Sequence, residues 1–138
     1  MSRALETLAR LQRAQIDEAK TALGEIVNAR AMLAARDASL AAEIVQEQAE
    51  AARDLAGVAA YGADAPRVTR ERQTLSREDT RLALEEETVR ARLADAYIEL
   101  KKIELLLATQ TERERTAENA RELSALDEAA AMRAARRR

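Results

Sequence analysis

Carboxylates are the side chains of this 138-residue chain whose type and spacing come nearest to catalytic chemistry. They occur in consecutive groups at Asp17–Glu18, Glu85–Glu87 and Asp127–Glu128. General acid–base catalysis by such groups needs a shaped, dry pocket, whereas carboxylates near arginines on a helix normally form solvated ion pairs. The chain has no His and no Cys, so the commonest acid–base group and all thiolate chemistry are absent. The residues therefore predict no enzymatic activity, no cofactor and no metal site.

The composition favours long helices that position these charges along their surfaces. Hydrophobic residues make up 47% of the chain, but much of this is alanine, and aromatic residues are only 1%. Ala, Leu, Arg and Glu are good helix formers, and three Gly and one Pro leave few breaks. The net charge of −2 disfavours a general nucleic-acid binder. There is no run of about 18 apolar residues, so we expect no membrane span.

A heptad repeat in the second half of the chain is the strongest structural signal. Apolar residues recur every seventh position, with a second row offset by four, and these steps of three and four place one seam along a single helix face. The two rows are Val68, Leu75, Leu82, Val89, Ala96 and Ile103, and Leu93, Leu100 and Leu107. We therefore expect an all-α protein that acts through the surfaces and ends of a coiled coil.

The sequence predicts one break, over residues 56–66, because Gly57, Gly62 and Pro66 cluster there. We expect one domain over residues 1–138, a long antiparallel two-helix coiled coil with helix one over about 2–55 and helix two over about 67–134. The predicted seam of helix one comprises Leu5, Leu8, Ala19, Leu23, Ile26, Leu33, Leu40, Ile44, Ala51 and Leu55.

Three residues of helix one depart from the apolar pattern. Arg30 and Asp37 fall near the seam, and we expect them to lie at its edge. Gly24 costs about 1 kcal/mol relative to Ala in a helix interior, so we expect a closely approaching partner helix there.

The unequal helix lengths predict an overhanging C-terminal helix end. At 1.5 Å per residue, helix one is about 80 Å long and helix two about 100 Å. A turn centred near residue 62 would place the N-terminus opposite residue 123, so residues 123–138 would project. The apolar residues of this overhang would lack an intramolecular partner, and the arginines that end it exceed what a helix dipole requires. The apolar residues predict a partner site, and the arginines fit either an acidic partner surface or the capping of the helix end alone.

Several short segments give the chain a resemblance to FliJ, the coiled-coil protein of the flagellar type III export apparatus. The matching stretches are Ala4–Leu8, Ile16–Ala19, Leu23–Glu25, Lys101–Lys102 and Leu126–Ala129 with the Ala-Met-Arg that follows. The resemblance implies a hairpin similar to the central stalk of rotary ATPases. It further implies that the end carrying both termini binds a hexameric export ATPase, and that the protein contacts the export gate membrane protein and export chaperones.

The resemblance implies a set of residues at the end that faces the ATPase. These are Leu5, Leu8, Leu11, Leu123, Leu126, Asp127, Glu128, Met132, Arg133, Arg136, Arg137 and Arg138. Many members of the family carry aromatic residues along the middle of the coil, whereas Tyr61 and Tyr97 are the only aromatic residues here. We therefore transfer no gate-binding residue. The expected location is the cytoplasm, peripheral at the inner face of the bacterial cell membrane.

Three alternatives stay open on the sequence. The stalk protein of injectisome-type secretion systems has the same architecture. A seam rich in alanine and poor in bulky residues also fits a self-associating structural coiled coil, such as a homodimer that swaps helices or pairs hairpins. Binding of nucleic acid or an anionic membrane by the terminal arginines is the weakest alternative, because the rest of the chain is slightly acidic.

Overall fold

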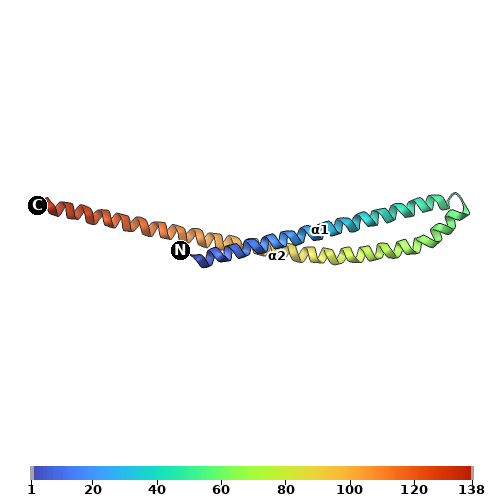
Figure 1. Cartoon of the computed structure of the whole chain (residues 1–138), viewed down its shortest axis with the longest axis horizontal. Coiled ribbons are helices and arrows are strands. Elements are labelled where there is room, and N and C mark those ends of the chain that lie inside the picture. The colour runs from blue at the N-terminus through green and yellow to red at the C-terminus, as the bar shows by residue number, and fades with distance from the viewer. Residues whose placement is uncertain (1, 138) are drawn as a thin grey trace. The chain divides into compact units, whose positions relative to one another are not determined.

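The computed structural model describes residues 2–137 and consists of two long helices. The first helix, α1, spans Arg3–Ala51, and the second, α2, spans Leu55–Arg136 (Figure 1). The described residues contain no strand. The prediction of an all-α helical hairpin is therefore confirmed. Neither described helix contains a stretch long and apolar enough to cross a membrane.

The chain divides into two compact units, each built from pieces of both helices. The turn unit comprises Asp17–Ala94 and includes the connection between α1 and α2. The terminal unit comprises Met1–Ile16 together with Asp95–Arg138. Each unit has its own set of buried seam residues, described below. A single domain over residues 1–138 stays a prediction.

The core of the turn unit is a single row of aliphatic side chains between antiparallel helices. Leu40 and Val68 are its largest fully buried side chains, with 0% and 1% of their surface exposed. Farther from the turn, Ile26, Leu82 and Val89 form a hydrophobic cluster. The side chains packed around that cluster are mostly small: Ala19, Ala22, Leu23, Ala29 and Leu33. Ile26, Leu40, Val68, Leu82 and Val89 were predicted on the seam and are buried. Leu55 was also predicted on the seam of helix one, and this is wrong: it is the first residue of α2 and 87% of its surface is exposed, because the turn comes earlier than predicted.

The terminal unit has a thinner core, because two of its four buried seam residues are alanines. Ala9, Ile16, Ala96 and Ile103 are its buried residues. Leu8 was expected on the seam, but 45% of its surface is exposed. The seven-residue step back from Ile16 places Ala9 inward, so the neighbouring Leu8 lies on the flank. The sequence therefore predicted the buried position at residue 8, one residue before the position that is buried in the structure.

The connection between the helices is shorter and earlier than the sequence predicted. It comprises only residues 52–54, and the expected breakers Gly57, Gly62 and Pro66 all lie inside α2. Asp54 begins α2 as its N-cap, because its Oδ1 accepts a hydrogen bond of 2.6 Å from the backbone N–H of Gly57. No described glycine has a positive φ. The predicted turn over residues 56–66 is therefore wrong, since the capping carboxylate, not the glycines, decides where α2 starts.

Gly57 is required by close packing against the end of α1. A Cβ atom added there would lie 2.8 Å from the backbone nitrogen of Ala51 and even closer to the carbonyl oxygen of Glu50. Backbone atoms cannot move aside as a flexible side chain can. By contrast, a Cβ atom at Gly24 would meet no atom within 4 Å. The expected close approach of a helix at Gly24 is therefore wrong, because the tight contact is at Gly57.

Alanine substitutions at these two glycines are expected to have opposite effects. Gly57→Ala should lower the free energy of unfolding by about 1–3 kcal/mol through the clash with Glu50. Gly24→Ala should raise it by up to about 1 kcal/mol, because it adds helix propensity without a clash. Urea denaturation followed by circular dichroism measures both. Equal stabilisation by the two substitutions would contradict the packing at the turn.

Candidate functional site

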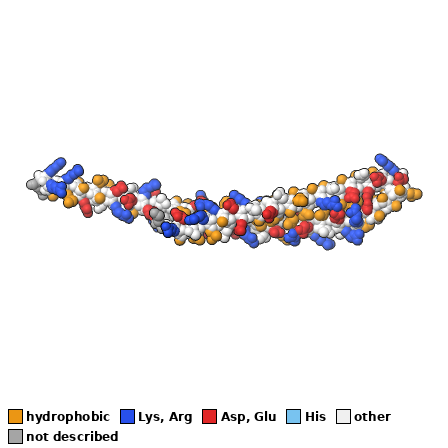
Figure 2. Space-filling model, viewed as in Figure 1, with side chains coloured by type: hydrophobic (Ala, Val, Ile, Leu, Met, Phe, Trp, Pro, Cys, Tyr) orange, Lys and Arg blue, Asp and Glu red, His pale blue; other side chains and the backbone are white. Residues whose placement is uncertain are grey.

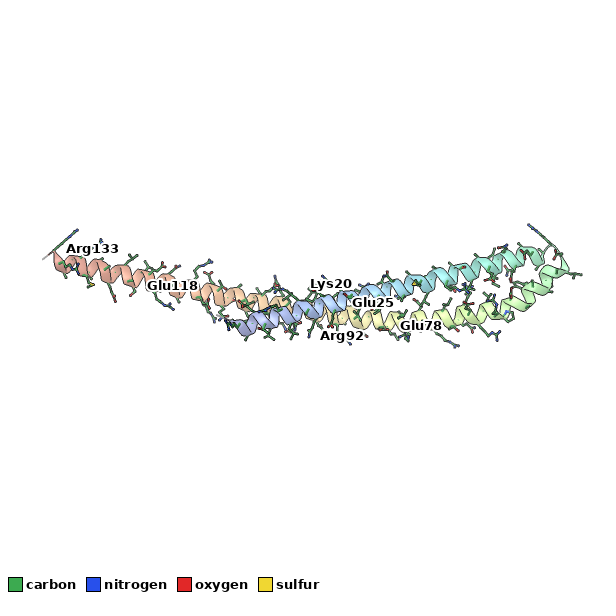
Figure 3. The ribbon with its side chains drawn as sticks, viewed as in Figure 1. Lys20, Glu25, Glu78, Arg92, Glu118 and Arg133 are labelled. Carbon is green, nitrogen blue, oxygen red and sulfur yellow. The ribbon has the colours of Figure 1, made fainter. Side chains whose placement is uncertain are left out.

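The candidate functional site is a long exposed segment of α2 in the terminal unit. Gln110 is the last half-buried residue, and every described residue over 111–137 is exposed. In Figure 3, Glu118 and Arg133 project from a stretch of α2 that has no second helix beside it. We call residues 111–137 the exposed segment. It is longer than the predicted overhang of residues 123–138, because the turn lies earlier in the chain. Moving the turn one residue towards the N-terminus moves the residue of α2 that faces a given residue of α1 by two positions in the same direction.

The structure separates the two halves of the predicted ATPase-facing set. Leu5 is half-buried beside the seam, and Leu8 and Leu11 are exposed on the paired part of α1. Leu123 lies 13 residues beyond Gln110, which is about 20 Å farther along the helix axis. The N-terminal leucines therefore do not lie beside the C-terminal members of the set. The early turn is the reason, since it ends the pairing near Gln110.

The C-terminal members of the set all lie in the exposed segment, apart from the last. The three apolar members have 61–66% of their surface exposed. Arg138 lies outside the described residues. The members in the exposed segment are Leu123, Leu126, Asp127, Glu128, Met132, Arg133, Arg136 and Arg137.

Apolar side chains of the exposed segment lie on opposite faces of the helix. Successive residues turn by about 100° around an α-helix, so Leu126 lies about 60° from Leu123 on one face. Met132, nine residues after Leu123, lies about 180° away on the other face, beside Ala129. A single continuous stripe would suit a flat groove. These residues instead step round the helix by about 60° each and spread apolar surface over about half of its circumference.

Reciprocal ion pairs cross the seam of the turn unit and were missed from the sequence. The Nε of Arg30 on α1 donates to Asp79 on α2 at 2.8 Å, and its Nη2 donates at 3.2 Å. Arg72 on α2 makes the same two bonds, at 2.8 and 3.2 Å, to Asp37 on α1. Arg30 and Asp37 thus do more than lie at a seam edge. The sequence did carry a signal for these pairs. Arg30 and Asp37 are seven residues apart on α1, and Arg72 and Asp79 are seven residues apart on α2.

These bonds lower the pKa values of the two aspartates. The hydrogen bond from Arg30 holds the pKa of Asp79 below its ordinary value of 3.8, and the bond from Arg72 does the same for Asp37. Because the folded-state pKa values are lowered, the stabilisation is present at neutral pH and is lost as the pH falls below about 3.8. Both pairs are partly exposed to solvent, which limits their strength.

A groove of about 820 Å³ lies between these ion pairs in the turn unit. Leu33, Ala34 and Leu75 are among its apolar lining residues. The charged residues of its lining already pair with one another, as Arg30 with Asp79 and Glu86, and Arg72 with Asp37. Figure 2 shows the same interspersion of basic and acidic side chains more widely along the molecule. We assign no ligand to this groove.

A group of carboxylates near the turn is the one set of described residues with spacing suited to a metal ion. Glu43, Glu47 and Asp64 each offer an oxygen atom, and these atoms lie within 4.8 Å of one another. All three residues are half-buried. Groups of acidic residues on helix surfaces are common without an ion, and the sequence did not single out these three.

The comparisons with known proteins identify the family. The family model described as "Flagellar FliJ protein" matches residues 1–138, the whole chain. No curated protein and no solved structure matches the chain. The family match agrees with the helical hairpin described above. The chain belongs to the flagellar FliJ family, and it is a component of the flagellar export apparatus.

Proposed function

We propose that this protein binds the hexameric ATPase of the flagellar export apparatus through its exposed segment, and promotes the activity or the assembly of that ATPase. The observation that carries the proposal is the exposed helix over residues 111–137, which presents Leu123 and Met132 on opposite faces. Exposed apolar side chains of this size mark partner sites. The protein itself acts without catalysis, as a stalk.

The arrangement of apolar residues favours a partner that surrounds the helix. A groove on a protein surface contacts one side of a helix, so Leu123 and Met132, which lie about 180° apart, would both lie at its edges. The central pore of a ring contacts a helix on every side. An asymmetric helix inside such a pore promotes ATP turnover only by binding some conformations of the ring more tightly than others.

Positive charge at the C-terminal end of α2 also supports binding through the exposed segment. Arg133 and Arg136 lie in the last turn of the helix, where cations complement the helix dipole, and Arg137 follows directly. None of these three arginines has a carboxylate partner among the ion pairs of the described residues. They are therefore available to acidic groups of the ring.

Substitutions on the two faces distinguish a ring from a groove. We expect Leu123→Asp and Met132→Asp each to weaken binding to the purified export ATPase by about tenfold or more, because each places an unpaired carboxylate in the contact. Binding by isothermal titration and ATP turnover against added protein are the measurements. Matched controls are Leu84→Asp and Met32→Asp, whose side chains are 62% and 73% exposed in the turn unit.

The outcomes separate three cases. Weakening by both substitutions, with the controls unchanged, supports insertion into a ring. Weakening by only one supports a groove on one face of the helix. Unchanged binding by both variants would contradict the proposed role of the exposed segment.

We further propose that the protein links the ATPase to the export gate membrane protein and to export chaperones. Membership of the flagellar FliJ family supports this, and it corresponds to a location in the cytoplasm, peripheral at the inner face of the bacterial cell membrane. Co-purification of the gate's cytoplasmic domain and of the chaperones with the full chain tests each link separately. We assign no residues to these contacts.

Self-association is the second candidate function, and the exposed apolar side chains of the turn unit favour it. Pairing of two hairpins into a four-helix bundle, as a homodimer, would cover part of this surface. The residues concerned are Val27, Met32, Val45, Leu55, Val58 and Leu84. Light scattering over a range of concentrations tests it, and a constant monomer mass would count against it.

A further inference from the structure

Two acidic residues face each other across the seam of the turn unit, close to the turn. Glu47 on α1 follows Leu40 by seven residues, and Asp64 on α2 precedes Val68 by four. Leu40 and Val68 are the two largest fully buried side chains among residues 2–137. Glu47 therefore holds a seam position that an aliphatic side chain occupies elsewhere, and Asp64 lies at the edge of the seam, next to the position that Ala65 holds in the second row of α2.

One oxygen of Glu47 is enclosed without a partner. Its Oε2 is buried and has no hydrogen-bond partner among the described residues. A buried carboxylate oxygen without a partner is costly while it is charged, and protonation removes this cost. The neighbouring carboxylates of Glu43 and Asp64, within 4.8 Å, add repulsion when all three are ionised.

The neighbouring cation is Arg67, and it is shared among too many carboxylates to neutralise all of them. Arg67 on α2 lies 3.2 Å from Glu43, 3.8 Å from Asp64 and 3.6 Å from Glu71. Its charge therefore offsets the repulsion on Glu47 only in part. Hydrogen bonding with Asp64, burial, and the charges of Asp64 and Glu43 together raise the pKa of Glu47 to about 7.

We propose that Glu47 and Asp64 form a proton-dependent clasp that holds the turn end of the two helices together. While the pair shares a proton, Glu47 and Asp64 hydrogen-bond across the seam. When the proton leaves, two carboxylates face each other with only part of one arginine between them, and the seam from residue 41 to residue 68 opens more often. The device lies in the turn unit and is independent of ATPase binding by the exposed segment.

The direction of the pH dependence follows from linkage. The folded state holds the proton more tightly than the unfolded chain, in which the pKa of a glutamate is about 4.5. The contribution to stability is therefore complete below pH 4.5 and is lost as the pH rises through about 7. The pH range just below and around neutrality is where the clasp responds.

Hydrogen exchange of the full chain measures the opening directly. Peptides that cover residues 41–68 are followed by mass spectrometry at pH 6 and pH 8, in the presence of a chelator, with times adjusted for the intrinsic rate of exchange. We expect protection of these peptides to fall by about threefold or more at pH 8, relative to peptides that cover residues 19–33. Equal protection at the two pH values would overturn the proposal.

Matched variants assign the effect to the pair. Glu47→Gln keeps the shape of the side chain but cannot titrate, so the pH dependence should disappear. Glu50→Gln changes an exposed glutamate on the same helix and should retain the wild-type dependence. If Glu47→Gln retains it as well, the proposal is wrong. If Glu47→Gln loses helicity, Asp64→Asn answers instead, since a flat profile supports the clasp and a wild-type profile overturns it.

Discussion

Removal of residues 123–138 is expected to abolish binding to the export ATPase and any stimulation of ATP turnover, while the rest of the hairpin stays folded. The described residues of this stretch are all exposed, so their loss removes no buried seam contact. The same residues carry Leu123, Leu126 and Met132, whose exposed surfaces are the basis of the proposed contact. Binding and function should therefore separate cleanly from folding.

Two measurements on the truncated chain establish this separation. Its urea-unfolding midpoint should match that of the full chain, and its ATPase stimulation should be absent. A matched control keeps residues 123–138 at the same length, composition and helix propensity but scrambles their order, which changes the faces that the apolar residues occupy. Full stimulation by the truncated chain would rule out the proposed docking end. Full stimulation by the scrambled chain would mean that charge and length suffice.

Leu40→Ala is expected to cause the largest loss of stability among alanine substitutions of the buried side chains in the turn unit, about 3 kcal/mol. Leu40 is fully buried, and its replacement leaves a cavity in a seam only one side chain wide. A two-helix core has few other contacts to compensate. Thermal and urea unfolding of the full chain, followed by circular dichroism at 222 nm as the usual helix signal, measure the loss.

Leu84→Ala is the matched control for this substitution. This substitution removes the same atoms from a leucine in the same unit, but 62% of the surface of Leu84 is exposed. We expect a change within about 0.5 kcal/mol, because an exposed leucine contributes little and alanine is an equally good helix former. If the two substitutions had similar effects, the burial of Leu40 in the seam would be incorrect.

The periodic part of the sequence predicted the structure most accurately. Of the predicted row, Leu75 is half-buried and the other five members are buried: Val68, Leu82, Val89, Ala96 and Ile103. The FliJ resemblance, based on short segments at both ends of the chain, agrees with the family match over residues 1–138. The prediction of the buried row succeeded because repeat spacing depends on the geometry of a single helix.

The residues around the turn were predicted less well, because two signals competed. Gly57 and Gly62 are common helix terminators, so the sequence favoured a break there. In the structure Asp54 caps α2 through its carboxylate, and the helix continues through both glycines and Pro66. The sequence alone does not say which of several capping signals the chain uses.

The sequence by itself determined the class of fold, the seam residues of α2 and the family. Only the tertiary structure decided the register between the helices, and with it the length of the exposed segment, the separation of Leu5 from Leu123, and the cross-helix partners of Arg30 and Glu47. The physical reason is that heptad spacing determines which face of a helix is buried but not which turn of the partner it meets. That choice depends on the closing contact at Asp54 and Gly57, where a capping bond and backbone packing outweigh local propensity.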